Sequence, residues 1–222
     1  MVMDAPVNSG KTTTSCISVL QKIDTSNLQC QALILTPSVG TTLRTLKVIL
    51  ALCGHNIHCH FCVDQADFRE DDMRLKKGAQ IVVGTPSCVQ EIIKRGALAT
   101  RNIRMIVLDR VDEMFSDGFK DVIDELFQAI PRSAQVMFLL SKSFVELKEL
   151  TTKFMRNPEC INHDTEEAEI DDGETLSGSA RQSEEILFEI EVRRYQRGDV
   201  IKHPQRPERV LTASPLHTFT DQ

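Results

Sequence analysis

A short loop near the beginning of the sequence has the residue types of a phosphate-binding site. An alanine is followed, after four residues, by Gly-Lys-Thr, and helical spacing begins at once. Backbone N–H groups of such a loop form a positive cradle, the lysine reaches terminal phosphates, and the threonine hydroxyl can bind Mg²⁺. A helix-capping loop without a ligand is the alternative. The candidate binding residues are Ala5, Asn8, Ser9, Gly10, Lys11 and Thr12.

A carboxylate at the end of an apolar segment is the second group suited to chemistry. Residues 105–108 are Met, Ile, Val and Leu, and Asp109 follows them. An acidic side chain at the end of a buried strand can hold a Mg²⁺-bound water beside a phosphate loop. Its alternative role is to cap the following helix. The phosphate loop upstream favours the metal role, with Thr12 and Asp109 as the metal-binding residues.

The segments that must position these groups alternate between two kinds of pattern. Short β-branched and aliphatic runs, typical of buried parallel strands, occupy residues 31–36, 58–63, 80–83, 105–108 and 136–140, with a strand stub at 1–3. Helical spacing occupies residues 12–22, 39–53, 68–77, 88–95, 119–130 and 145–156. Regular alternation of strand and helix predicts an α/β fold with a doubly wound parallel sheet.

The last part of the sequence differs in composition. Residues 164–174 contain seven acidic side chains, so we expect an acidic linker over residues 161–185. A dedicated partner site is the alternative for this charge run. Apolar residues alternate with charged ones over residues 186–192, which would suit one exposed strand. We expect the tail, residues 186–222, to be mostly unstructured or irregular, which leaves one folded domain over residues 1–160.

Charge and cysteine content limit the class of protein. The net charge is -6, but residues 1–158 carry 19 Lys and Arg against 17 Asp and Glu, and the remainder carries 7 against 15. The body of the protein therefore lacks the broad basic surface of a protein that binds nucleic acid by charge alone. The seven cysteines follow no basic-then-apolar leader, and no apolar run approaches the length of a membrane helix. These features predict reduced thiols and a cytoplasmic protein, or alternatively a nuclear one, with no membrane association.

A cluster of histidines and cysteines over residues 55–62 could form half of a metal or redox site. Cys59 and Cys62 have the spacing of zinc ligands, but no second pair with ligand spacing follows them. Alternation along a strand would also direct these two side chains to opposite faces. A buried, thiol-rich strand is therefore favoured over a metal site.

Several separate blocks resemble the DEAD-box RNA helicases, in particular the branch of eukaryotic initiation factor 4A. The sequence D-R-V-D-E-M at residues 109–114 stands where the family has D-E-A-D-E-M, and G-F-K-D follows at 118–121. Further matches are Q-A-L-I-L at 31–35, V-V-G-T-P at 82–86 and K-F-M-R-N-P at 153–158. The resemblance covers about residues 1–158, and its blocks occur in the family's order, which makes it more specific than any single motif.

The resemblance implies a nucleotide-binding, RecA-like lobe with ATP and Mg²⁺ as cofactors and RNA as a partner. Asp109 would hold the metal's water, and Asp112 would couple the nucleotide site toward Ser141 and Ser143. The implied RNA contacts are Pro37, Gly84 and Thr85.

The sequence departs from the family at its catalytic base. Arg110 stands at the place of the glutamate that would deprotonate the attacking water. An arginine cannot act as a general base at physiological pH, and loss of a positioned base typically slows a reaction about 10² to 10⁴-fold. Its charge would also repel Mg²⁺ by about 4 kcal/mol at 4 Å with an effective dielectric of 20. We therefore expect ATP to bind and its hydrolysis to be impaired.

The implied coupling and RNA motifs have also changed. Ser141, Lys142 and Ser143 replace the family's S-A-T, and residues 37–42 have lost the arginine of its P-T-R-E-L-A. Ser87 and Cys88 replace a Gly-Arg pair, so a second phosphate-directed arginine is absent. We expect RNA binding to be weak and strongly sensitive to salt.

The family's adenine-recognising segment and second lobe have no counterpart in the sequence. We therefore expect a monomeric lobe that does not unwind RNA alone and, because its first strand is short, is marginally stable. The alternatives are a catalytically dead module that still binds helicase partners, and the product of a degenerating gene copy.

Overall fold

The computed structural model describes residues 1–6, 9–53, 57–63, 68–142, 144 and 146–162. Residue contacts divide the chain into Met1–Ile170 and Asp171–Gln222, and every described residue belongs to the first unit. The predicted linker beyond residue 162, the predicted exposed strand at residues 186–192 and the rest of the tail lie outside the described residues.

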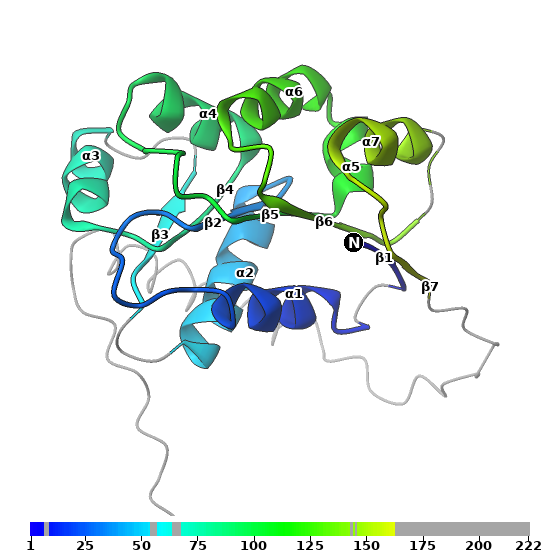
Figure 1. Cartoon of the computed structure of the whole chain (residues 1–222), viewed down its shortest axis with the longest axis horizontal. Coiled ribbons are helices and arrows are strands. Elements are labelled where there is room, and N and C mark those ends of the chain that lie inside the picture. Colours follow the sequence, from blue (N-terminus) through cyan, green and yellow to red (C-terminus); the bar gives the residue numbers. More distant parts are fainter. Residues whose placement is uncertain (7–8, 54–56, 64–67, 143, 145, 163–222) are drawn as a thin grey trace, which may run out of the picture. The chain divides into compact units, whose positions relative to one another are not determined.

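A seven-stranded sheet forms the centre of the described unit, in the order β3-β4-β2-β5-β6-β1-β7 (Figure 1). Every pair of neighbouring strands is parallel, which confirms the predicted α/β fold with a doubly wound parallel sheet. The strands are β1 (Val2–Asp4), β2 (Ala32–Leu35), β3 (Cys59–Cys62), β4 (Ile81–Gly84), β5 (Met105–Asp109), β6 (Gln135–Leu140) and β7 (Cys160–Asn162).

Helices cover both faces of the sheet. The helices are α1 (Lys11–Leu20), α2 (Val39–Leu52), α3 (Phe68–Lys77), α4 (Pro86–Lys94), α5 (Val111–Ser116), α6 (Lys120–Ala129) and α7 (Leu147–Phe154). The pair α1 and α2 lies on one face, whereas α4, α5, α6 and α7 lie on the other (Figure 1). Within the described ranges, no helix is long and apolar enough to span a bilayer.

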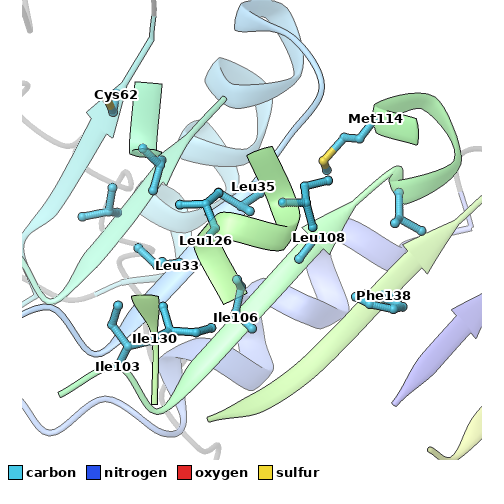
Figure 2. Packing of buried hydrophobic residues seen from close by; sticks show 14 of the residues in the cluster. Leu33, Leu35, Cys62, Ile103, Ile106, Leu108, Met114, Leu126, Ile130 and Phe138 are labelled. Carbon is cyan, nitrogen blue, oxygen red and sulfur yellow. The ribbon is translucent and has the colours of Figure 1, made fainter. Parts of the chain in front are cut away.

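The main core lies between the central strands and the layer that contains α4 and α6. Figure 2 shows side chains of β2 and β5, such as Leu33 and Ile106, packed near Leu126 and Ile130. These residues are at most 6% exposed. Strands β2 and β5 are buried on both faces, which explains why their sequences are continuous apolar runs without alternation.

Two elements were not predicted from the sequence pattern. Helix α5 has only six residues, too few to show helical periodicity, and the predicted helix over residues 119–130 begins after it as α6. Strand β7 follows Pro158, where we expected regular structure to stop, and it pairs in parallel with β1. Its three residues form a strand because β1 offers them a free edge, which no local pattern reveals.

The expectation of reduced thiols is wrong for two of the seven cysteines. A disulfide joins Cys62, the last residue of β3, to Cys88 in the first turn of α4. The other five cysteines form no disulfide. The sheet order brings the end of β3 beside the helix that follows β4, and a spacing of 26 residues in the sequence does not show this proximity. As half of a disulfide, Cys62 has no thiolate for a metal ion.

Candidate functional site

The candidate groups meet at the carboxyl ends of the parallel strands. Strand β6 lies between β1 and β5, and its registers place Asp4 opposite Leu140 and Asp109 opposite Leu139. The loop that follows β1 leads into α1, and the turn that follows β5 leads into α5. Parallel strands with crossover helices collect their following loops at one edge, where such sheets bind ligands. The topology thus brings together residues about one hundred positions apart in the sequence.

The described ends of the loop between β1 and α1 have features that suit a phosphate cradle. The Ala5 N–H donates a hydrogen bond to the Leu140 carbonyl at 3.4 Å, which attaches the loop to the sheet. Gly10 precedes α1 with φ 88°, a left-handed conformation that other residues rarely adopt. Apart from its two chain neighbours, no described residue has an atom within 4 Å of the place where a Cβ on Gly10 would stand. Asn8 lies outside the described residues.

The Lys11 ammonium turns back onto its own loop. It donates hydrogen bonds to the carbonyl oxygens of Ala5 and Pro6, the second at 2.5 Å, and lies 3.5 Å from the Ser9 hydroxyl. Burial lowers the pKa of Lys11, and the carboxylates of Asp109 and Asp112 oppose that shift. The carbonyl oxygens occupy the positions that phosphate oxygens would take around the ammonium. Lys11 must therefore exchange these partners when a phosphate binds.

Thr12 and Asp109 are brought together as the sequence predicted. The Thr12 hydroxyl donates a hydrogen bond of 2.7 Å to Asp109 Oδ2, and Asp109 is only 5% exposed. Burial raises the pKa of Asp109, whereas the Thr12 hydrogen bond and the charges of Arg110 and Lys11 lower it. A hydroxyl and a carboxylate side by side are a suitable oxygen ligand set for Mg²⁺. The alternative role of Asp109 as a helix cap is not supported, because Arg110 is the N-cap of α5.

Arg110 is held in an ion pair that the sequence analysis did not predict. Its backbone has φ 61°, and its guanidinium donates to both carboxylate oxygens of Glu113, at 2.9 and 3.2 Å. The spacing of three residues between opposite charges at a helix start is the signal that could have revealed this pair. The Arg110 side chain is 30% exposed, so the pair contributes about 1 kcal/mol or less to stability. Its main effect is to orient the guanidinium toward α5.

The structure describes only some residues of the predicted coupling path between Asp112 and Ser141 and Ser143. Asp112 Oδ1 is buried without a hydrogen-bond partner among the described residues. Ser141 is half-buried and directly follows β6, and Ser143 lies outside the described residues. Burying a carboxylate oxygen without a hydrogen-bond partner costs free energy. Asp112 therefore offers an unused acceptor next to the candidate nucleotide site, and a donor there would remove this cost.

The predicted RNA contacts gather at the neighbouring part of the same edge. Leu35 pairs with Gly84 in the sheet, so the turns around Pro37 and Thr85 are adjacent. The Thr85 N–H donates to the Cys62 carbonyl at 3.2 Å, while its hydroxyl is buried and has no partner in the described part of the chain. A Cβ on Gly84 would lie 2.4 Å from the Cys62 carbonyl oxygen, which excludes any larger residue there.

Helix α2 begins at this RNA-candidate edge with two of the N–H groups around its start bound by a capping box. Ser38 is its N-cap, and the side chains of Ser38 and Thr41 each accept a hydrogen bond from the other's backbone N–H. Pro37, which precedes the cap, is buried. This capping box stabilises the helix start and competes with any external anion for the same donors.

Solved structures share the fold of this lobe. A DEAD box protein from the hyperthermophile Methanococcus jannaschii superposes with a TM-score of 0.70 at 27% identity, over 72% of this chain and 44% of that one. Saccharomyces cerevisiae Dbp5, solved with RNA and ADP BeF3, superposes with a TM-score of 0.66 over 73% of this chain and 41% of its own. At 22% identity, the second likeness shows the fold alone.

Sequence comparisons agree with the fold and extend it to a family. The ATP-dependent RNA helicase eIF4A of Schizosaccharomyces pombe is 46% identical over 159 residues, and that of Pyricularia oryzae is 45% identical. These matches cover 71% of this chain but only 41% and 40% of the relatives, so the chain spans about two fifths of their length. The model of the DEAD/DEAH box helicase family matches residues 1–146. With a phosphate loop, a strand-end aspartate and a parallel sheet in the same arrangement, the chain belongs to the DEAD/DEAH box helicase family.

Proposed function

We propose that this chain is an ATP- and RNA-binding lobe of the initiation factor 4A type that binds Mg²⁺ and ATP but hydrolyses ATP poorly. The hydrogen bond between Thr12 and Asp109 carries this proposal. It joins the first turn of α1 to the end of β5 and leaves a hydroxyl and a carboxylate beside the Lys11 ammonium. That combination of one cation and two oxygen ligands suits a metal-bound polyphosphate.

Each residue of the loop has a separate part in the proposed binding. The open backbone at Gly10 and the N–H groups that begin α1 would receive phosphate oxygens. Lys11 would leave the carbonyls of Ala5 and Pro6 to bind the terminal phosphates. Thr12 and the water held by Asp109 would bind the Mg²⁺ ion, which neutralises phosphate charge when bound.

Impaired hydrolysis follows from the side chain of Arg110. A guanidinium remains protonated at physiological pH and cannot accept the proton of an attacking water. Its pairing with Glu113 at 2.9 Å also engages one of the two carboxylates of α5, since both oxygens of Glu113 accept from Arg110. The ion pair gives the Arg110 guanidinium a carboxylate partner on α5, which partly offsets the positive charge that Mg²⁺ would meet near Asp109.

RNA binding is proposed at the start of α4. The N–H groups of Ser87 and Cys88 lie in the first helical turn, where no preceding helical carbonyl is available to them, and the unpaired Thr85 hydroxyl lies beside them. These donors suit a backbone phosphate and carry no base specificity. With few cations at this edge we expect weak binding that falls steeply as salt rises.

The nucleotide part is tested by titrating a fluorescent ATP analogue against the protein and Lys11→Ala, with and without Mg²⁺. Loss of a charge-assisted contact to phosphate should weaken binding about 10- to 100-fold in the variant. Lys22→Ala is a matched control, because Lys22 follows α1 and bonds Gln135 rather than the loop. Equal affinities of the parent protein and Lys11→Ala would contradict nucleotide binding at this loop.

A catalytically dead module that binds other proteins is the second candidate function. The Arg110 to Glu113 pair favours it, because this pair serves no purpose in hydrolysis. The two candidate functions differ in whether bound ATP is hydrolysed. A module without turnover should bind nucleotide without releasing phosphate above the Lys11→Ala background, whereas measurable release after removal of contaminating ATPases would support an enzyme.

A further inference from the structure

The disulfide lies at the junction between the sheet and the proposed RNA-binding turn. Cys62 is the last residue of β3, and Cys88 lies in the first turn of α4, with their Cα atoms 5.9 Å apart. Both residues are buried, at 0% and 3% exposure. Figure 2 shows Cys62 at the margin of the main core (Figure 2). The covalent bond therefore connects an edge strand directly to the helix start.

Non-covalent contacts fasten the same turn at a second point. The Thr85 N–H donates to the carbonyl of Cys62, the residue that also supplies one sulfur. Gly84 brings the backbone of β4 so close to that carbonyl that a Cβ would lie 2.4 Å from it. Cys62 thus holds residues 84–88 through its carbonyl oxygen and through its side chain.

We propose that the Cys62–Cys88 disulfide is a redox-controlled clamp, which fixes the first turn of α4 for RNA and releases it on reduction. This inference rests on the proposed function, because it concerns the turn to which RNA phosphates were assigned. With the bond closed, the N–H groups of Ser87 and Cys88 are held in place before RNA arrives. RNA binding then loses less conformational entropy in this turn, so the oxidised protein binds RNA more tightly.

The reductant that would open the clamp is a dithiol. Its thiolate attacks one cysteine sulfur, the S–S bond breaks, and the other cysteine leaves as a thiolate. The second thiol of the reductant then displaces the first cysteine, so that the reductant becomes a cyclic disulfide. Its two protons end on Cys62 and Cys88, and two electrons have passed to the protein. The reverse reaction with an oxidised dithiol closes the clamp.

The remaining thiols favour a bond that stays between these two residues. Burial raises the pKa of Cys16 and of Cys30 to about 12, so neither supplies a thiolate that could attack the disulfide at neutral pH. A hydrogen bond with the neighbouring Cys53, together with burial, also raises the pKa of Cys59. Exchange with these three buried thiols is therefore suppressed, which leaves an external dithiol to open the clamp.

RNA and reduction should oppose each other. If closing the clamp raises RNA affinity by some factor, bound RNA must make the disulfide harder to reduce by the same factor, because the two equilibria are linked. Because both cysteines are buried, the turn must also open before a dithiol can attack the disulfide. This reciprocity distinguishes a clamp from a disulfide that only stabilises the fold.

The test compares the full chain in its oxidised form and after equilibration with a dithiol. Peptide mapping should find Cys62 joined to Cys88, and reduction should lower the Tm by roughly 5–15 °C. The affinity for a fluorescent single-stranded oligouridylate should fall about 3- to 10-fold on reduction. Cys88→Ala should bind with the reduced affinity in both states. The matched control Cys160→Ala, which alters an exposed free thiol, should keep the redox response.

Three outcomes would overturn the clamp: no Cys62–Cys88 peptide in the native protein, equal RNA affinity in the two redox states, or a midpoint potential that RNA leaves unchanged. Absence of RNA binding in both states would contradict the proposed function first, and the clamp with it. Persistent nucleotide binding would then show that the lobe is folded.

Discussion

The nucleotide edge and the RNA edge of the sheet differ in how far their polar groups are already engaged. At the nucleotide edge, Thr12 and Asp109 bond each other, and within the described residues the Lys11 ammonium bonds carbonyls and the serine of its loop. These partners can be exchanged for a metal ion and phosphates without disturbing a helix or a strand. The groups proposed for phosphate and metal binding therefore only need to rearrange.

At the RNA edge, the chain's own structure uses part of the donors that a phosphate could bind, and leaves the first N–H groups of α4 and the Thr85 hydroxyl for it. The capping box of Ser38 and Thr41 occupies the start of α2, and the Thr85 N–H is bound to Cys62. Releasing either would weaken the fold. Within one lobe, polar groups are more available to a ligand where their internal hydrogen-bond partners can be replaced. We therefore expect nucleotide to bind more tightly than RNA.

The largest expected effect comes from Arg110→Glu, which would give the nucleotide edge a carboxylate. We expect ATP turnover to rise about 10²-fold, the lower end of the range for a positioned general base. Phosphate release measured under saturating ATP would show it. Arg110→Gln is the control, since it removes the ion pair with Glu113 and adds no base. If both variants turn over ATP equally, the missing base is not what limits hydrolysis.

A smaller effect is expected from Asp109→Asn. The change removes the charge that would hold the metal's water but keeps a group able to accept the Thr12 hydrogen bond. Affinity for an ADP analogue in the presence of Mg²⁺ should fall about 10-fold, and affinity without Mg²⁺ should change little. Calorimetry with and without the metal separates the two. A similar loss under both conditions would assign Asp109 a structural role instead.

The Mg²⁺-dependent part of nucleotide affinity should also respond to acid. Burial raises the pKa of Asp109 above its ordinary value of 3.8, so its carboxylate is protonated, and its metal affinity lost, at a higher pH than for an exposed aspartate. Because folding raises this pKa, ionised Asp109 destabilises the folded state at pH values above the ordinary pKa. This destabilisation disappears as the pH falls through the folded pKa. Titrations of Mg·ADP binding at decreasing pH should show this loss, and Asp109→Asn should not share it.

The smallest effect tests the RNA edge. Ser38→Ala should lower the free energy of unfolding by about 1 kcal/mol, because the N-cap of α2 loses its side-chain acceptor. Urea denaturation gives this value. Ser18→Ala is a suitable control, since the Ser18 hydroxyl bonds only a carbonyl within α1 among the described contacts. An unchanged midpoint in Ser38→Ala would show that the cap does not compete with RNA for the start of α2.

The sequence predicted the sheet well, because the sheet depends on local patterns. Continuous apolar runs identified β2 and β5, and the Gly-Lys-Thr motif located Lys11 and Thr12 at the start of α1. Thr12 and Asp109 were both predicted as metal-binding residues, and the fold places their side chains in contact. Nucleotide and metal binding, coupling through Asp112 and the RNA contacts remain predictions.

The features that sequence reasoning missed depend on contacts between distant segments. Cys88 was interpreted only as the loss of an arginine, whereas the fold places it against Cys62. Strand β7 exists because β1 provides a partner. The turn of Lys11 back onto Ala5 depends on the loop's conformation, and residue types alone do not specify it.

The position of β1 has a consequence for the order in which the lobe is built during synthesis. Val2 pairs with Phe138 on one side and with Cys160 on the other, so the strand that leads into the phosphate loop has no neighbours until those later residues have been made. Strands β2, β3, β4 and β5 are contiguous in the sheet and are all translated earlier. Pairings so distant in the chain form slowly. The nucleotide site should therefore be the last part of the lobe to mature on the ribosome, with its lysine-bearing loop exposed to chaperones until then.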